Sequence, residues 1–253
     1  MSDLISSLPD EIICYILYFL PSKQVVATSV LSKRWTLLWR YVSSLDFDLN
    51  QDFYEDDHDN GYCHSMHSFL VRRGDQPLYK FRIRGYSCDI TKSIKSLIRT
   101  ALSGSGRVQI IDLFCLWEDT AISSMVFNFK TLVALKLKYT IMEDISFVDL
   151  PFLKFLHLKY IISLIEDYLS QILSGCPNLE DLKVRVGTSE AKGKFIRLSK
   201  LVRANIDNIL LSLETFKEVE VLRFNWLTPV RFITFYNCSL PHRISTAEIL
   251  ITT

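Results

Sequence analysis

Three histidines and one cysteine that lie close together are the residues best suited to bind a metal ion. They fall in the polar, acidic stretch DFYEDDHDNGYCHSMHSF, as His58, Cys63, His64 and His67, flanked by Glu55, Asp56, Asp57 and Asp59. A structural zinc site needs a pair of ligands at each end of a loop, and this stretch lacks the second pair. We therefore expect a solvated insertion without a metal, and metal binding is the alternative.

The other motifs that could indicate a catalytic or ligand-binding site match known sites less well than this stretch does. The Gly-Ser-Gly at 104–106 lacks the lysine and the Ser/Thr of a phosphate-binding loop, so it predicts a turn. Serines such as Ser163 have no partner histidine in a recognisable motif, and His157 falls on a predicted strand as a surface or groove residue. We expect no catalytic residue, no cofactor and no metal, and hence a protein that is not an enzyme.

Length, charge and cysteine usage narrow the classes of protein. A chain of 253 residues can form one small module and one larger domain. The formal net charge of +1 provides no overall basic field for a nucleic acid. The six cysteines are scattered without a C-x-x-C pair, which indicates a reducing compartment.

The N-terminal region also indicates where in the cell we expect the protein to be. The longest uncharged run there, residues 12–22, is too short to cross a bilayer, and no Lys or Arg precedes it. We expect a soluble intracellular protein, in the nucleus, the cytoplasm or both, without a membrane partner.

Residues 4–47 are expected to form three helices. Ser6 and Ser7 can cap the first helix, Pro9 suits its first turn, and Pro21 ends it. One apolar stripe is formed by Ile12, Ile13, Ile16, Leu17 and Leu20. The opposite face is also apolar or amphipathic, through Cys14, Tyr15, Tyr18 and Phe19. A module of this size cannot cover such a helix on all sides, so something else must cover it.

Two shorter helices are predicted next, with Ser22 and Ser32 as caps. The last of them places Trp35, Leu38 and Trp39 on one face, beside Lys33, Arg34 and Arg40. Large aromatic side chains next to arginine are typical of the anchors of a protein interface.

The rest of the chain repeats one six-residue pattern, in which the first, fourth and sixth residues are apolar. The eight copies are Val42, Leu45 and Phe47; Leu78, Phe81 and Ile83; Val108, Ile111 and Leu113; Leu132, Leu135 and Leu137; Leu153, Leu156 and Leu158; Leu179, Leu182 and Val184; Leu201, Ala204 and Ile206; and Val219, Leu222 and Phe224. Their spacing lies mostly near the period of leucine-rich repeats, and the last two positions of each copy alternate as in a strand.

We therefore expect an α/β fold, a three-helix N-terminal module followed by an irregular leucine-rich-repeat solenoid with parallel strands inside and helices outside. Residues 162–177 have the spacing of an outer helix that ends at Gly175 and Pro177. A conventional α/β sheet is the alternative.

Charged residues lie between the apolar positions of the predicted strands, as an exposed strand face requires. They include Lys136, Lys138, Lys154, Lys159, Glu180, Asp181, Lys183 and Arg185. The basic ones could make the concave face suited to an acidic client. The alternative is that they only keep an open sheet face soluble.

The N-terminal blocks resemble a known module. They resemble the F-box of plant F-box/leucine-rich-repeat proteins in their order and separations, through LPDEII, IL, FLPSK, TSVLSKRW, LLW and LDFD. Later segments resemble the repeats that follow the F-box in that family, for example FKTLVALKLKY and SGCPNLEDLKV. The resemblance implies a non-catalytic substrate-recognition subunit of an SCF ubiquitin ligase, which binds a Skp-type adaptor and through it cullin, and holds an unknown client protein through the repeats. The residues that match the F-box pattern are Leu8, Pro9, Ile12, Ile13, Ile16, Leu17, Leu20, Pro21, Val26, Leu31, Trp35, Leu38 and Trp39.

The resemblance divides the chain into an F-box at 1–45, a repeat region at 46–226 and an atypical segment at 227–253. Relatives often continue into a C-terminal FBD region, and this chain is expected to lack it. A shortened product that binds the adaptor as a decoy or scaffold, without delivering a client, is the alternative function.

Overall fold

The computed structural model describes residues 5, 7–48, 60–85, 96, 98–102, 107–115, 121–122, 124–142, 145, 147–161, 166–185, 196–206 and 213–224. The chain divides into two compact units, Met1–Thr120 and Ala121–Thr253. The predicted atypical segment 227–253 and the turn at 104–106 lie outside the described residues.

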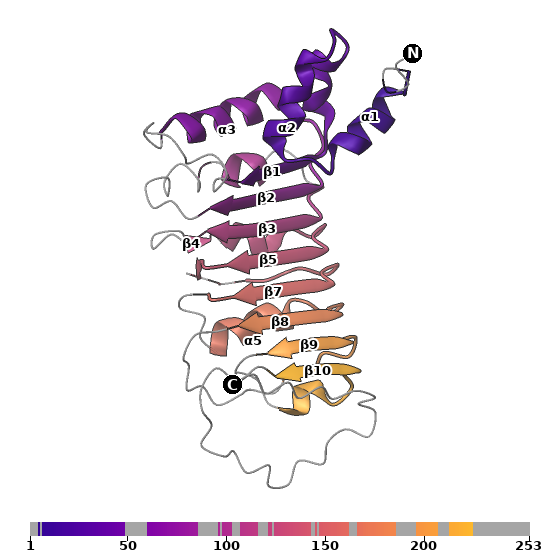
Figure 1. Cartoon of the computed structure of the whole chain (residues 1–253). Helices are drawn as coiled ribbons and strands as arrows, with labels where there is room; N and C mark the ends of the chain where they lie inside the picture. Colours follow the sequence, from indigo (N-terminus) through magenta and orange to yellow (C-terminus); the bar gives the residue numbers. More distant parts are fainter. Residues whose placement is uncertain are drawn as a thin grey trace. The chain divides into compact units, whose positions relative to one another are not determined.

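The first unit begins with short helices and continues into parallel strands (Figure 1). Its elements are α1 (Asp10–Leu17), α2 (Ser22–Ala27), the 3₁₀ helices η1 (Thr28–Val30) and η2 (Trp35–Tyr41), β1 (Ser44–Asp48), α3 (Asn60–Arg73), β2 (Lys80–Gly85) and β3 (Ile110–Cys115). The strands follow the order β1-β2-β3, and Leu45 faces Phe81, which faces Ile111. Parallel strands joined by long connections are what the predicted repeats require.

The second unit continues the same pattern with shorter connections (Figure 1). Its elements are β4 (Ala121–Ile122), η3 (Ser124–Asn128), β5 (Ala134–Lys138), β6 (Ile141–Met142), β7 (Phe155–Lys159), α5 (Glu166–Ser174), β8 (Asp181–Arg185), β9 (Arg203–Ile206), η4 (Leu213–Phe216) and β10 (Val221–Phe224). The parallel order within this unit is β5-β7-β8-β9-β10, and β4 pairs with β6 separately.

The apolar triplets behave as the sequence predicts. Each described member from Val42 to Leu222 is buried, with Leu135, Leu156 and Leu182 fully enclosed. The backbone shows the same repeat, because the residue just before a strand accepts two consecutive N–H groups from the next copy. Lys154, for example, accepts hydrogen bonds from the N–H groups of Glu180 and Asp181, both at 2.9 Å. This repeated bond sets the register of one copy on the next.

The connections differ in part from the prediction. Helix α5 lies inside the predicted 162–177 and gives way to Gly175, where an added Cβ would come within 2.5 Å of the Val148 carbonyl oxygen. Two other connections contain the 3₁₀ helices η3 and η4 in their described residues rather than the predicted α-helices. The prediction of a solvated insertion at 52–69 is wrong for residues 60–69, which belong to α3. Met66 and Leu70 of this helix are buried, which the local composition does not reveal.

The predicted helix caps also need correction. Helix α1 begins after Pro9, with no side-chain cap, and it ends at Leu17, before Pro21. Ser22 lies inside α2 and does not cap it, because its hydroxyl oxygen instead accepts a hydrogen bond from the Asp46 N–H at 2.9 Å. The third predicted helix is the 3₁₀ helix η2, preceded by Arg34 rather than capped by Ser32. No helix in the described part of the chain has the length and apolar character needed to cross a bilayer.

Candidate functional site

Helix α1 uses one side to close a small core. Ile13 and Leu17 are 0% and 1% exposed and pack with residues of α2 and η2. This core consists of Ile13, Leu17, Val25, Trp35, Leu38, Trp39 and Val42, with Leu8, Cys14, Tyr18, Leu20 and Phe69 packed against it. The core explains why α1 holds its position although it is only eight residues long.

The other side of α1, together with the turn that follows it, leaves four apolar side chains in solvent. Ile12, Tyr15, Ile16 and Phe19, which we call the α1 stripe, are 46%, 64%, 46% and 62% exposed. Their spacing of i, i+3, i+4 and i+7 continues one face of α1 into the turn after it, where the Phe19 N–H donates to the Ile16 carbonyl oxygen at 3.3 Å. Exposed apolar side chains concentrated on one helix face are a feature of protein docking surfaces.

Further exposed apolar residues follow in α2, η1 and η2. Val30 and Leu31 are 85% and 64% exposed, and Leu37 and Tyr41 in η2 are 50% and 57% exposed. The segment from α2 to η2 therefore contributes side chains to the core and also leaves apolar side chains exposed, where a partner could contact them.

The structure divides the thirteen predicted F-box residues into three groups by exposure. Ile13, Leu17, Trp35, Leu38 and Trp39 are buried, and Leu8, Leu20 and Pro21 are half-buried. The exposed members are Pro9, Ile12, Ile16, Val26 and Leu31. Exposed apolar residues absent from that prediction are Ile5, Tyr15, Phe19, Val30, Leu37 and Tyr41. The helical spacing of Tyr15 and Phe19 relative to Ile12 was the signal that could have added these two.

A charged contact fixes the start of α1. The Arg34 guanidinium donates from Nε to Asp10 Oδ1 at 2.8 Å and also donates to the Leu8 carbonyl. Asp10 lies in the first turn of α1, where a carboxylate complements the positive end of the helix dipole. The contact holds the α1 stripe in a defined position relative to the segment before η2.

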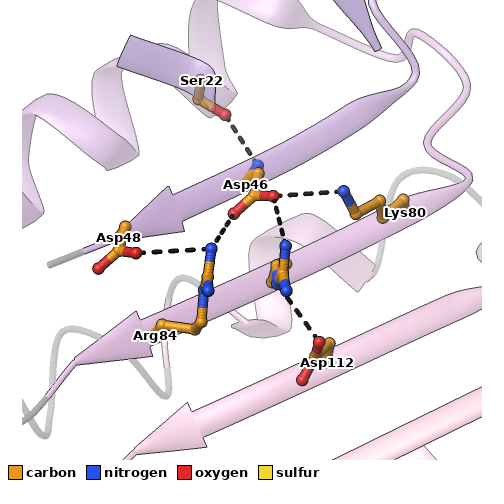
Figure 2. Close-up of polar contacts among 7 residues, drawn as sticks. Ser22, Asp46, Asp48, Lys80, Arg84 and Asp112 are labelled. Atoms are coloured by element: carbon orange, nitrogen blue, oxygen red, sulfur yellow. Dashed lines mark hydrogen bonds and ion pairs between the residues drawn. The ribbon is translucent and has the colours of Figure 1, made fainter. Parts of the chain in front are cut away.

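Strand β1 joins these helices to the sheet through a buried carboxylate. Figure 2 shows Asp46 between Ser22 of α2 and the basic side chains of β2. Asp46 is 5% exposed, and its oxygens lie 3.2 Å from Lys80 Nζ and 3.1 Å from Arg82 Nη1. Arg82 and Arg84 continue the network to Asp112 of β3 and Asp48 of β1, at 3.3 and 3.5 Å. The three acidic and three basic side chains balance each other in charge.

Arg73 at the end of α3 makes a second polar link. Its guanidinium donates to the carbonyl oxygens of Val42 and Gln76 at 2.9 and 3.1 Å. Burial lowers the pKa of Arg73 to about 10, which leaves the side chain protonated at neutral pH. This cation therefore joins α3 to the residue that follows η2.

A groove of about 450 Å³ runs beside α1. It is lined by Glu11, Cys14, Tyr15, Tyr18, Tyr41, Ser43, Tyr79 and Gln109. Burial, together with the nearby charges of Asp10 and Glu11, raises the pKa of the Cys14 thiol above its ordinary value. The thiol is thus protonated at neutral pH, which does not favour nucleophilic chemistry.

The predicted metal ligands are only partly covered by the structure. His58 and the side chains of Cys63 and His64 lie outside the described residues, and His67 is exposed on α3. Within the described ranges, no three His, Cys, Asp or Glu side chains form a cluster that could hold a metal ion.

The second unit has a polar cluster around Asp181. The sequence predicts an exposed strand residue, yet Asp181 is only 6% exposed. Its carboxylate accepts hydrogen bonds from His157 Nε2 at 2.9 Å and Arg203 Nε at 3.0 Å, and Lys183 Nζ lies 3.9 Å away. Burial alone would raise the pKa of Asp181, but the hydrogen bonds from Arg203 and His157 outweigh it and the pKa is lowered.

His157 in the same cluster is neutral near pH 7. Burial lowers its pKa, and the neighbouring cations Lys183 and Lys136 act in the same direction, against the hydrogen bond to Asp181. The sequence predicts His157 as a surface or groove residue, and in the structure its ring is half-buried and hydrogen-bonded to Asp181.

Comparison with known proteins identifies the N-terminal helices. Residues 5–47 match the F-box domain, a range that spans α1 to β1 and contains the α1 stripe. The chain contains an F-box domain. The match includes both the core residues of the module and the exposed apolar residues that the core leaves in solvent.

The chain also matches relatives over residues that extend beyond the F-box domain. An F-box/LRR-repeat protein of Arabidopsis thaliana is 37% identical over 191 residues, which cover 71% of this chain and 49% of the relative. An F-box/FBD/LRR-repeat protein of the same plant is 35% identical over 185 residues, 72% of this chain and 41% of the relative.

A third Arabidopsis thaliana relative, a putative FBD-associated F-box protein, is 32% identical over 224 residues, 87% of this chain and 51% of the relative. The chain thus spans about half the length of the curated relatives it matches. The predicted lack of an FBD region concerns residues outside the described part of the chain and stays a prediction.

Proposed function

We propose that this protein is the substrate-recognition subunit of an SCF-type ubiquitin ligase. In this proposal, residues 1–45 bind a Skp-type adaptor, and through it cullin, while residues 46–226 bind a client protein. The observation that carries the proposal is the α1 stripe, an exposed apolar helix face inside the residues that match the F-box.

The energetics of the stripe support docking. Fully burying a side chain such as Ile or Phe contributes about 1.5–3 kcal/mol. Four such side chains, each exposed by 46% or more, offer a partner a sizeable apolar contact at little cost in helix ordering, because α1 is already fixed by Ile13 and Leu17.

The mechanism would be proximity rather than catalysis by this chain. The adaptor would hold the F-box, the repeats would hold the client, and the ligase would bring a ubiquitin-charged carrier near the client's lysines. Such work would be done inside the cell, in the nucleus or the cytoplasm.

The test is calorimetric titration of the full chain with a purified Skp adaptor. We expect the double variant Ile16→Ser, Phe19→Ser to weaken binding at least tenfold, because both changes remove apolar contact area without entering the core. Changing Leu8 would be less informative, since it packs against the core and its loss would mix folding with binding.

A matched control comes from the second unit. Phe147 and Phe152 are 61% and 62% exposed there, as Phe19 is in the first. The double variant Phe147→Ser, Phe152→Ser should bind the adaptor as the native chain does. Failure of the folded native chain to bind, or equal losses in both double variants, would overturn the proposal.

A further inference from the structure

Helix α1 borders a groove whose lining is rich in tyrosine. We call this hollow the tyrosine groove, and its lining residues are Glu11, Cys14, Tyr15, Tyr18, Tyr41, Ser43, Tyr79 and Gln109. Its volume of about 450 Å³ lies within the range of about 300–1,000 Å³ that is typical of small-molecule sites in proteins. The chemistry of the lining therefore decides which kind of small molecule fits.

Two helices supply three of the tyrosines. Tyr15 lies in α1 and Tyr18 directly after it, and the buried Ile13 and Leu17 hold this helix against α2 and η2. Tyr41 is the last residue of η2. The core of the N-terminal helices therefore also fixes this side of the groove.

The other side of the groove is formed by the repeat itself. Ser43, Tyr79 and Gln109 each lie one residue before a strand, at β1, β2 and β3. The Tyr79 N–H donates to the Ser43 carbonyl oxygen at 2.8 Å, and the Gln109 N–H donates to the Tyr79 carbonyl oxygen at 2.9 Å. Because these hydrogen bonds fix the backbone, little ordering is left for a ligand to impose.

Phe19 orders two of the tyrosine rings. The ring centroids of Tyr15 and Tyr18 lie 5.2 and 5.3 Å from that of Phe19, and both pairs have edge-to-face geometry. This is one of the favourable arrangements of aromatic rings, because the positive edge of one ring meets the negative face of the other. The two tyrosines are thus held by packing as well as by the backbone.

One ring of the groove already lies near a cation. Lys80 Nζ, which donates a hydrogen bond to Asp46, is 5.8 Å from the centroid of the Tyr18 ring. The face of a tyrosine ring is negative and attracts a cation within about 6 Å. Among the residues that the structure describes, no protein cation lies over any other tyrosine of the groove.

Glu11 gives the lining a negative charge. Its carboxylate forms no ion pair with a described residue, whereas the neighbouring Asp10 accepts a hydrogen bond from Arg34 Nε at 2.8 Å. The pKa of the Cys14 thiol is raised by burial and, in addition, by the charges of Asp10 and Glu11. The lining has no basic side chain, so the groove combines tyrosine rings with one unpaired carboxylate.

We propose that the tyrosine groove binds a small organic cation, in which an ammonium group is attached to a short, partly polar body. The ammonium group interacts with the tyrosine rings and with Glu11, and the hydroxyl and amide groups of Ser43 and Gln109 form hydrogen bonds with the body. One unpaired carboxylate matches one positive charge, which favours a free cation over a peptide with many basic residues.

This ligand site goes beyond the ligase function proposed above and does not depend on it. Adaptor docking is assigned to the α1 stripe, and Tyr15 alone belongs both to the stripe and to the lining of the groove. The two proposals can therefore be tested by different variants.

The test is a ligand-observed NMR titration of the full chain with choline, a quaternary ammonium alcohol. The matched probe is its neutral carbon isostere, the alcohol in which a tert-butyl group replaces the trimethylammonium group. We expect choline to bind at least tenfold more tightly than the neutral alcohol, because only the charged group interacts with the ring faces and with Glu11.

Two variants at Tyr79 test the role of the rings. Tyr79→Leu removes a ring from the groove and should weaken choline binding about threefold or more. Tyr79→Phe keeps the ring and should bind choline within about twofold of the native chain. Thermal unfolding followed by circular dichroism checks that both variants fold.

A second pair of variants tests the carboxylate. Glu11→Gln should weaken choline binding about threefold or more, because it removes the charge that opposes the ammonium group. The control is Glu218→Gln, which removes an equal charge from an exposed residue of the second unit and should leave choline binding unchanged.

Several results would overturn the proposal. They are the absence of choline binding, equal binding of choline and the neutral alcohol, and unchanged choline binding in both Tyr79→Leu and Glu11→Gln. A lysine-rich peptide that displaces choline and binds at least tenfold more tightly would also overturn it, since the groove would then be a site for a protein segment.

Discussion

The outward faces of β1–β3 and of β5–β10 are built from the same repeat but differ in their numbers of acidic and basic residues. On β1–β3, three acidic and three basic side chains pair with one another around Asp46 (Figure 2). On β5–β10, seven strand residues are basic and one, Asp181, is acidic. Asp181 accepts hydrogen bonds from Arg203 and His157 and lies 3.9 Å from Lys183 Nζ. The two faces thus place a central carboxylate among different sets of basic side chains, so removal of that carboxylate should affect their stability differently.

The difference is reinforced by burial. Lys80 and Arg82, the closest partners of Asp46, are 18% and 28% exposed, whereas Lys183 and Arg203 beside Asp181 are 38% and 52% exposed. Water can therefore replace a lost carboxylate more readily in the second unit. The predictions that follow use this contrast.

The largest effect is expected for Asp46→Asn. The change leaves three basic side chains of β2 without their shared carboxylate in a mostly buried site, so we expect it to destabilise the chain by about 3–5 kcal/mol. Urea unfolding followed by circular dichroism measures this. A loss below about 1 kcal/mol would show that β1–β3 does not depend on its charge balance.

A smaller effect is expected for Asp181→Asn. The side chain keeps its shape and can still accept a hydrogen bond from Arg203, and the exposed cations regain water, so the expected loss is about 1–2 kcal/mol. The same urea experiment compares it with Asp46→Asn. Equal losses would contradict the contrast between the two faces.

Stability should depend on pH through His157. Its pKa is lowered in the folded chain, so the unfolded chain takes up the proton first as the pH falls. The contribution is fully present above the ordinary histidine pKa of about 6.5 and is lost as the pH falls through that value towards the folded pKa, with a slope of at most about 1.4 kcal/mol per pH unit. Urea unfolding at pH 7.5, 6.5 and 5.5 measures the loss.

The matched control for this pH effect is His157→Gln, which retains a donor for Asp181 but does not titrate. The difference in unfolding free energy between the native chain and this variant should shrink or reverse towards pH 5.5. If this difference stays constant over the three pH values, the titration of His157 does not cause the change in stability with pH. The strands β1–β3 carry no histidine, so the contribution belongs to the second unit.

The smallest effect is expected for Lys136→Gln. Lys136 is one of the cations that lower the pKa of His157, and it faces His157 across β5 and β7. Removing it should raise that pKa, which NMR titration of the His157 ring can follow. Arg84→Gln in the first unit is the comparison, and it should leave the His157 titration unchanged. A decrease in the His157 pKa on Lys136→Gln would contradict the proposed repulsion.

Much of the fold could be predicted because it depends on local alternation. Leu135 and Leu137 are separated by one residue, so a strand must place both on the same face, and their apolar character selects the inner one. The same reasoning applied to each copy gives the parallel repeats. Helix α3 could not be predicted in this way, because its sequence NGYCHSMHSFLVRR is polar overall and only tertiary packing of Met66 and Leu70 favours it.

The candidate site was predictable only as a set of residues. Ile12 and Ile13 are adjacent and chemically alike, yet Ile12 is 46% exposed and Ile13 is fully buried. The pattern of α1 is apolar on nearly every side, so its sequence does not indicate which side faces the core. The partners Trp35 and Leu38, more than twenty residues away, decide that.

By itself, the sequence determined the F-box match, the apolar triplets and hence the parallel strands, because each depends on residues within one short segment. Only the tertiary structure decided how charge is distributed. Asp46 meets Arg82 and Asp181 meets His157 because parallel register brings residues more than twenty positions apart to bonding distance. Coulomb interactions act over a few ångströms of space and not over sequence separation, so a composition close to neutral can fold into one balanced face and one basic face.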